Sequence, residues 1–281
     1  MSAFKKIKKT NFFVLFVEVG LVLILGYSIW QIALYCQEGG KEKDFNEDLA
    51  SSAVSEISPE DDYDYSEEAI GRIEPFEGFE AEESDILIYP DIKVDLNKVK
   101  EKYPKVVGWI YSPGTPINYP VVQGTDNVYF VDHMPNGVQN SAGSIFMDSR
   151  DPSTLTDFAH VIYGHNMKNN SMFGTILDYK KEGYFEEHPF MFYFTEDKVY
   201  RLEIFGGLNT ISSSSIYSEP TDKAAFISNV FSGSTFRSSV TVTPEDKLIL
   251  LSTCSGAVGQ SNRYVLFAKL VEKSAKRGKI S

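Results

Sequence analysis

Only one cysteine lies beyond the N-terminal apolar stretch of this chain, and its surroundings make it a candidate nucleophile. Cys254 ends the apolar run Leu248-Ile249-Leu250-Leu251-Ser252-Thr253, which has the length and composition of a buried strand. Arg263, nine residues later, opens a second apolar run. Two strands joined by the loop 255–262 form a hairpin that brings a thiol beside a permanent cation. The alternative is a small buried hydrophobic residue, as many free cysteines are.

A nucleophilic thiol needs a base or an ion-pair partner, and among the four histidines His165 is the best placed to provide one. It follows the apolar run 158–163 after a single glycine, and a polar loop comes next. Active-site residues are often found at such strand exits. His160 lies inside the run, where a satisfied strand histidine is the ordinary explanation. His133 and His188 lie in a polar stretch and in a turn.

Such residues need a scaffold, and the pattern from residue 90 onward predicts one domain of many short strands with few helices. Strands are expected at 106–110, 116–122, 143–147, 158–163, 190–194, 199–206, 247–253 and 263–271. Helices are expected at 96–103, around 171–179 with a further turn at 181–187, and at 220–231, with Pro220 in the first turn and Gly233 as the stop signal. This order is typical of a β-barrel or sandwich with peripheral helices.

The N-terminus predicts a membrane anchor. Four lysines within residues 1–11 precede an apolar stretch at 12–36, and about 20 residues suffice to cross a bilayer. Basic residues before the stretch and acidic residues after it predict a cytoplasmic N-terminus and an extracellular remainder. A cleaved signal peptide is the alternative, but its apolar region is normally shorter and ends at an Ala-x-Ala-like site. Lipidation at Cys36 is disfavoured because Tyr35 precedes it. We therefore expect an uncleaved, single-pass anchor.

Acidic residues concentrate between the anchor and the domain. Residues 37–89 hold about eighteen acidic residues against Lys41, Lys43 and Arg72, and therefore carry most of the net charge of -12. Few of these residues are aliphatic, so the segment cannot bury enough apolar surface to offset the entropy of ordering it. The composition predicts a disordered, self-repelling linker.

Charge and residue spacing exclude several classes of partner. From residue 90 onward acidic and basic residues balance, so no basic field exists for nucleic acid. The tail at 273–281 is weakly basic; it is expected to be a solvated terminus, with anionic polymer or lipid contact as the alternative. Neither Cys-x-x-Cys nor His-x-x-x-His spacing occurs outside the anchor, which predicts no metal site. No phosphate-binding glycine loop is present, and no cofactor is expected.

The motifs of this domain, taken together, resemble the sortase transpeptidases, specifically class B. They are Tyr163-Gly164-His165-Asn166-Met167, Met172-Phe173-Gly174, Leu251-Ser252-Thr253-Cys254 with Arg263, and the upstream segments 108–110, 120–124 and 142–146. They occur in the family's order, and the likeness extends from about residue 96 to 271. One position departs from the family, which usually shows Thr-Leu-x-Thr-Cys, because the first position here is Leu250.

This resemblance implies a closed eight-stranded barrel of the sortase type over residues 90–272, with His165, Cys254 and Arg263 as the catalytic trio. Asn166 and Met167 are expected to line the substrate groove, by adjacency to the histidine and by likeness to the family. Ser252 and Thr253 flank the thiol, and one of this alternating pair should face inward, to pack or to form a hydrogen bond near the site. Ordinary packing is the alternative for all four of these supporting residues.

The resemblance also implies acyl transfer in two steps. Cys254 attacks a backbone carbonyl in the C-terminal sorting signal of a secreted protein and forms a thioester, which an amine then resolves. A free thiol is only a few per cent thiolate at about pH 7, so the neighbouring base and cation matter. Likeness to class B points to an Asn-Pro-x-Thr-type signal and to attachment of the protein to the cell wall of a Gram-positive-type cell. A pilus-building enzyme that uses a pilin lysine is an alternative, although the tail holds no second apolar span.

Two other functions remain open from the residues alone. A cell-wall cysteine peptidase would use the same pair of side chains, but papain-like peptidases place the cysteine before the histidine, whereas His165 here precedes Cys254 by 89 positions. Arg263 also has no counterpart in that scheme. A non-catalytic adhesin on a stalk would fit the anchor, the linker and the β-rich domain. It would leave an unpaired extracellular cysteine without a purpose.

Overall fold

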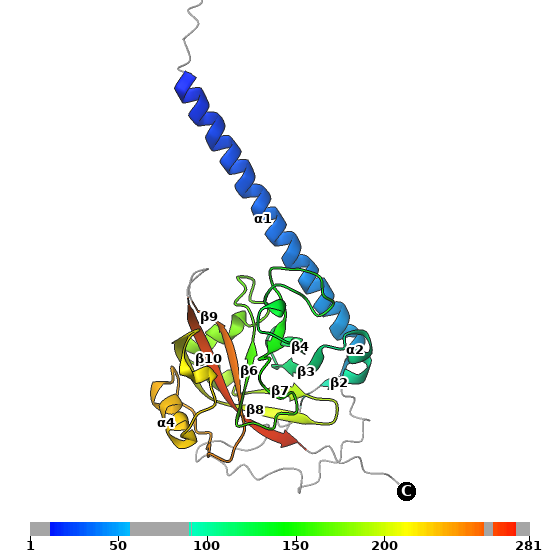
Figure 1. Ribbon diagram of the computed structural model, residues 1–281, viewed down its shortest axis with the longest axis vertical. Helices are drawn as coiled ribbons and strands as arrows, with labels where there is room; N and C mark the ends of the chain where they lie inside the picture. The colour runs from blue at the N-terminus through cyan, green and yellow to red at the C-terminus, as the bar shows by residue number, and fades with distance from the viewer. Residues whose placement is uncertain (1–11, 57–89, 91, 256–260, 274–281) are drawn as a thin grey trace, which may run out of the picture.

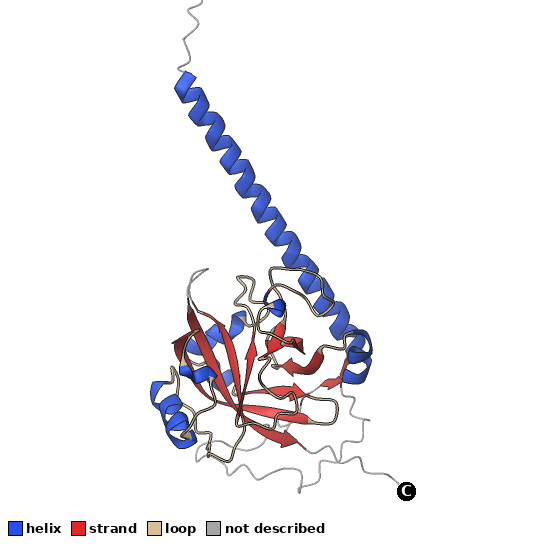
Figure 2. Cartoon of the chain, in the orientation of Figure 1, coloured by secondary structure: helices blue, strands red, loops and turns tan. Residues whose placement is uncertain are grey.

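The computed structural model describes residues 12–56, 90, 92–255 and 261–273, and a closed β-barrel forms its centre (Figures 1 and 2). The barrel strands are β3 (Val106–Tyr111), β4 (Asn118–Gln123), β5 (Ile145–Met147), β6 (Ala159–Tyr163), β7 (Phe190–Phe194), β8 (Val199–Ile211), β9 (Leu248–Cys254) and β10 (Asn262–Lys273). They are hydrogen-bonded in the order β10-β8-β7-β3-β4-β5-β6-β9. The predicted eight-stranded barrel is therefore confirmed.

Most neighbouring strands are antiparallel, but β4 pairs with β5 and β6 pairs with β9 in parallel. The parallel pair of β6 and β9 matters for function because the carboxyl ends of these two strands meet at one edge of the barrel. Strand β10 runs antiparallel to β9, so its first residues lie at the same edge. The ends of three strands are thereby gathered in one place.

The residues of β9 explain why its sequence is a continuous apolar run. Ile249 and Leu251 belong to the cluster inside the barrel. Leu248 and Leu250 belong to a second cluster outside it, which includes Ile227 and other residues of α4 (Lys223–Gly233). Both faces of the strand are buried, so the pattern has no polar alternation.

The helices lie around the barrel, and two of them differ from the sequence prediction. They are α2 (Leu96–Lys102), α3 (Tyr184–Glu187), α4 and the 3-10 segments η2 (Tyr129–Val131), η3 (Gly174–Lys180) and η4 (Ser215–Tyr217). The helix expected at 171–179 is the 3-10 segment η3. Pro220 lies outside α4, because the side chain of Asp222 accepts a hydrogen bond from the backbone N–H of Ala225 and caps the helix there.

The N-terminal helix α1 (Phe12–Ala53) is 42 residues long and projects from the barrel (Figure 1). Its first part is the one helix, within the described ranges, that is long and apolar enough to cross a membrane. Its last part lies beside α2. Strand β1 (Val54–Glu56) follows directly and pairs antiparallel with β2 (Ile92–Val94).

The prediction of a structureless linker is wrong for residues 37–56, which form helix and strand. Glu42, Asn46, Leu49 and Ala53 are all buried, and their spacing places them on one face of a helix. That face packs on the domain, and its burial offsets the entropy of ordering the segment. Two of the four residues on this buried face, Glu42 and Asn46, are polar. Counting acidic and aliphatic residues in the segment therefore does not reveal the face. Residues 57–89, the N-terminal 1–11 and the tail 274–281 lie outside the described residues.

If residues 38–53 belong to the folded domain, Leu49→Ala should lower the free energy of unfolding by about 2–3 kcal/mol, because it leaves a cavity in a packed cluster. Leu49 is 6% exposed and packs with Leu96 and Val99 of α2. Chemical denaturation of the full chain in detergent measures the effect. Asp48→Ala, one exposed residue earlier, is the matched control and should change little. Equal stability of both variants would show that the helix does not dock.

Candidate active site

Cys254 and Arg263 face each other across two strands. In the ladder between β9 and β10, Cys254 pairs directly with Arg263, and Thr253 pairs with Tyr264. Side chains of directly opposed residues project from the same face of a sheet. The thiol, which is partly exposed, and the guanidinium therefore share one side of the barrel edge, as the predicted hairpin requires.

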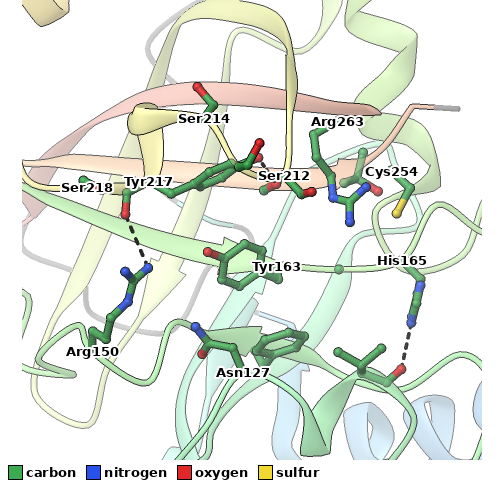
Figure 3. A pocket seen from close by; sticks show the side chains of 16 residues that line it. Asn127, Arg150, Tyr163, His165, Ser212, Ser214, Tyr217, Ser218, Cys254 and Arg263 are labelled. Atoms are coloured by element: carbon green, nitrogen blue, oxygen red, sulfur yellow. Dashed lines mark hydrogen bonds between the residues drawn. The ribbon is translucent and has the colours of Figure 1, made fainter. Parts of the chain in front are cut away.

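His165 reaches the same edge from the other neighbour of β9. Tyr163, at the end of β6, pairs in parallel with Ser252 of β9, and the N–H of Gly164 donates to the carbonyl oxygen of Ser252 at 3.1 Å. His165 is two residues beyond Tyr163, as Cys254 is two beyond Ser252. The register thus brings imidazole and thiol to the same level, and Figure 3 shows both side chains at one end of a pocket.

A backbone carbonyl orients the imidazole. The Nε2 atom of His165 lies 2.7 Å from the carbonyl oxygen of Val131 (Figure 3). A carbonyl can only accept, so Nε2 carries a hydrogen and donates it. The other ring nitrogen, Nδ1, is thereby left to exchange protons with a reacting group. The position of Val131 is itself tightly set, because Gly143 adopts a φ of +59° and packs directly against the carbonyl of Val131.

Close packing also explains the glycine that precedes the histidine. A Cβ atom at Gly164 would lie 2.5 Å from Cδ1 of Ile145 and 2.7 Å from the ring of Phe173. Both neighbours are buried in the barrel cluster and cannot move aside easily. A residue with a side chain would therefore displace the start of the loop that carries His165.

The pocket at this edge has a volume of about 550 Å³. Its lining side chains come from six segments, and they are Asn127, Val131, Phe146, Arg150, Tyr163, Gly164, His165, Ser212, Ser213, Ser214, Tyr217, Ser218, Ser252, Thr253, Cys254 and Arg263. The predicted trio lies at one end, Arg150 lies at the other, and Tyr163 and Tyr217 lie between them (Figure 3). The site is an elongated, mixed polar and aromatic cleft rather than a closed cavity.

A buried carboxylate stabilises the side of the pocket away from the trio, called here the far wall and formed by Asn127, Arg150, Tyr163 and Tyr217. Asp148 is 0% exposed; it accepts hydrogen bonds from Nε and Nη2 of Arg150 at 2.9 and 2.6 Å and from the hydroxyl of Tyr163 at 2.9 Å. Burial raises the pKa of Asp148, but the hydrogen bonds from Arg150, Asn127 and Tyr163 outweigh burial and hold the pKa well below its ordinary value. The carboxylate is therefore ionised at neutral pH, and the Tyr163 hydroxyl is a fixed donor.

Tyr217 joins this wall to the strand of the nucleophile. Its hydroxyl lies 2.9 Å from Oγ of Ser252, and its carbonyl oxygen accepts from Nη2 of Arg150 at 3.3 Å. Burial raises the pKa of Tyr217, against the opposing effects of the Ser252 hydrogen bond and the charge of Arg263. The phenol therefore stays neutral.

The supporting residues predicted from the sequence divide into two groups. Ser252 and Thr253 both line the pocket, and both are buried. The Thr253 hydroxyl has no hydrogen-bond partner within the described part of the chain. Asn166 and Met167 do not line the pocket, contrary to the prediction. Met167 is 7% exposed in the barrel cluster and Asn166 pairs with Met172, because the chain reverses directly after the histidine.

Sequence reasoning missed the residues of the far wall. Asn127, Arg150 and Tyr217 come from segments without a regular apolar period, and the pattern around Tyr163 indicates only a strand residue. The one available signal was the polar stretch that follows the short apolar run 145–147, since polar residues at strand exits often serve a site. Within the described ranges, no group of three or more histidine, cysteine, aspartate or glutamate residues could hold a metal ion.

Comparison with known proteins agrees with this geometry. A family model of the sortase domain matches residues 110–271. Sortase B of Listeria monocytogenes is 32% identical over 188 residues, which are 65% of this chain and 76% of that protein. The 2.0 Å crystal structure of Staphylococcus aureus sortase B is similar with a TM-score of 0.60 and 29% identity, over 64% of this chain and 87% of that one. A Bacillus anthracis protein similar to sortase B gives a TM-score of 0.59 at 32% identity, over 64% and 83%.

The chain therefore belongs to the sortase family. Within that family it belongs to class B, since the relatives by sequence and by structure are sortase B proteins. It is a cysteine transpeptidase rather than the cell-wall cysteine peptidase or the non-catalytic adhesin that the residues alone left open.

Gly164→Ala should lower the free energy of unfolding by about 1–3 kcal/mol, as overpacking of a filled core does. The added methyl group must push against Ile145 and Phe173. Denaturant unfolding of the full chain measures the change. Gly40→Ala is the control, because a Cβ at Gly40 meets nothing within 4 Å in α1, and alanine favours the helix. If both variants unfold together with the parent, the packing around Gly164 is looser than the structure indicates.

Proposed function

We propose that this transpeptidase cleaves the C-terminal sorting signal of a secreted protein through a thioester on Cys254 and transfers the acyl group to an amine of the cell wall. The observation that supports the proposal is the register of β6, β9 and β10, which brings His165, Cys254 and Arg263 to one end of the pocket. These three residues are assigned as acid and base, nucleophile, and electrostatic stabiliser, respectively.

In the first step, the Cys254 thiolate attacks the carbonyl carbon of the scissile peptide bond. The carbonyl oxygen becomes an oxyanion, and the guanidinium of Arg263, opposite Cys254 in the ladder, stabilises the developing charge. The C–N bond then breaks as His165, in its imidazolium form, protonates the leaving amine from Nδ1. The products are a thioester and the released C-terminal fragment.

In the second step, the incoming amine attacks the thioester carbon. His165 now takes the proton from the nitrogen, the C–S bond breaks, and Cys254 leaves as a thiolate. The hydrogen bond from Nε2 to the carbonyl of Val131 stays in place through both steps and holds the ring at a fixed angle. One imidazole can therefore serve as acid and then as base without a change of position.

The cleft fits an extended peptide with a polar character. Ser212, Ser213 and Ser214 line it beside Tyr217 and Asn127, so both hydrogen-bonding and aromatic contacts are available along its length. An Asn-Pro-x-Thr-type sorting signal is the proposed substrate. A sortase B of Staphylococcus aureus has been solved as a substrate complex, and a sortase B has been solved with a triglycine peptide; both support the choice of a peptide donor and an amine acceptor.

The proposed location is the cell membrane of a Gram-positive-type cell. Residues 12–36 are assigned as the single-pass anchor, residues 1–11 as its cytoplasmic end, and residues 90–272 as the extracellular catalytic domain. The large apolar side chains of α1 between Leu15 and Ile32 are exposed, as a lipid-facing helix requires. The basic residues of 1–11 support the orientation.

Cys254→Ala should abolish thioester formation and transpeptidation, because it removes the sulfur atom to which the acyl group is transferred. The assay incubates the full chain in detergent with a sorting peptide and a nucleophilic amine, and mass spectrometry detects the amide-linked product and the acyl-enzyme. Cys36→Ser is the control and should retain full activity, since Cys36 is an exposed residue of α1. Normal turnover by Cys254→Ala would refute the assignment.

Arg263→Lys should reduce kcat/KM by about a hundredfold or more, because the loss of one donor to a developing oxyanion typically costs about 2.7–4 kcal/mol. Lysine keeps the charge but lacks the planar pair of donors. The same assay measures the loss, and Arg237→Lys, an exposed substitution away from the pocket, serves as the control. Equal rates for the two variants would remove Arg263 from the mechanism.

A further inference from the structure

The last part of α1 carries two buried polar residues that its role as an anchor does not explain. Glu42 is 0% exposed and Asn46 is 9% exposed, and the amide of Asn46 donates to Oε1 of Glu42 at 2.5 Å. Burial raises the pKa of Glu42, although its hydrogen bonds with Asn46 and Ser171 oppose the rise. Burying a carboxyl group is unfavourable unless its contacts compensate, so the partners of Glu42 indicate what it does.

These polar residues lie where α1 touches two loops of the catalytic domain. The carbonyl oxygen of Glu38 accepts a hydrogen bond from Nδ2 of Asn140 at 2.8 Å. One turn further along the helix, Oε2 of Glu42 accepts from Oγ of Ser171 at 3.5 Å. The apolar half of the buried face, Leu49 and Ala53, packs instead among α2, β2 and β3. The polar and apolar halves therefore contact different parts of the domain.

The first of the two loops carries the carbonyl group that orients the catalytic imidazole. The N–H of Asn140 donates to the carbonyl oxygen of Asp132 at 2.9 Å, and Asp132 adjoins Val131. Asn140 also accepts through Oδ1 from the N–H of Ala142 at 2.9 Å. The same side chain thus closes this loop and joins it to Glu38. Asn140 therefore links Glu38 of α1 to the residue that follows Val131.

The second loop begins at His165 itself. The N–H of Phe173 donates to the carbonyl oxygen of His165 at 2.9 Å, which closes residues 166–172 into a tight turn. Within it, Asn170 and Met172 adopt positive φ values of 61° and 55°. Asparagine tolerates this conformation, but for methionine it is unfavourable. Such a turn needs external contacts, and Ser171, between these two residues, receives one from Glu42.

We propose that residues 38–53 of α1 are part of the active-site scaffold, with Glu42 as a positioning residue for His165. The helix contacts both loops on which the imidazole depends, one through Glu38 and one through Glu42. It therefore sets the distance between the Val131 carbonyl and the backbone of His165. The catalytic part of this inference relies on the proposed role of His165, while the structural part does not.

Two measurements on the full chain in detergent test the proposal. The first is hydrogen exchange of the segment 166–174, followed by mass spectrometry. Glu42→Ala should speed exchange of this segment by about tenfold, because the contact that supports the turn is lost. Glu47→Ala is the matched control, since Glu47 lies on the same helix with its side chain 67% exposed; it should leave the exchange unchanged.

The second measurement separates kcat from KM, with rates normalised to the titrated Cys254 thiol in a Cys36→Ser background. Glu42→Ala should lower kcat by about tenfold to a hundredfold, since a misplacement of about 1 Å can cost about 10²-fold. KM for the sorting peptide should change less than about twofold, because Glu42 does not line the pocket. Glu42→Gln keeps an acceptor oxygen for Ser171 and should restore most of the rate.

Ser171→Ala provides an independent variant in case Glu42→Ala reduces the yield of folded protein. It removes the partner in the loop and should reproduce both the faster exchange and the lower kcat. Unchanged exchange and kcat in Ser171→Ala, or equal effects of Glu42→Ala and Glu47→Ala, would overturn the proposal. If the parent chain does not join the peptide to the amine, the proposed function fails, and the exchange measurement alone decides this inference.

Discussion

The site depends on the position of β9 between β6 and β10. Strand β6 is parallel to β9, and β10 is antiparallel to it. The ends of β6 and β9 and the start of β10 therefore lie at the same edge of the barrel. A slip of one residue in either ladder would turn His165 or Arg263 to the opposite face of the sheet. The apolar side chains of β9, buried on both faces, prevent that slip. The packing of the core on both faces of β9 therefore also fixes the geometry of the site.

At the far wall of the cleft, side chains are positioned by hydrogen bonds to a buried carboxylate and not by strand register. Asp148 is fully buried, yet its partners Arg150 and Tyr163 both line the pocket. The carboxylate holds these two side chains at fixed positions, and Arg150 in turn holds the backbone of Tyr217. The cleft is thus shaped by charge-assisted hydrogen bonds at one end and by strand register at the other. Of the two, only the strand register can be predicted from the spacing of apolar residues in the sequence.

This difference explains how much could be predicted from the sequence. The hairpin of Cys254 and Arg263 and the strand before His165 were predictable, because long apolar runs with polar exits reflect a buried barrel. The docking of residues 38–53 was not, since Glu42 and Asn46 occupy the buried face and resemble solvated residues in a composition count. Adjacency in sequence also misplaced Asn166 and Met167, because the chain turns back immediately after the histidine. Arg150 and Tyr217 meet the site only through tertiary contacts.

The short ladder between β1 and β2 changes how the acidic segment is understood. Glu56 pairs with Ile92 and Val54 pairs with Val94, so the polypeptide leaves this point at residue 56 and comes back to it at residue 92. Helix α1 and the barrel domain are therefore joined at this ladder by residues that the structure describes. The 42-residue helix α1 therefore leads directly into the folded domain. In the membrane-anchored enzyme proposed above, the length of α1 sets the height of the catalytic domain over the bilayer.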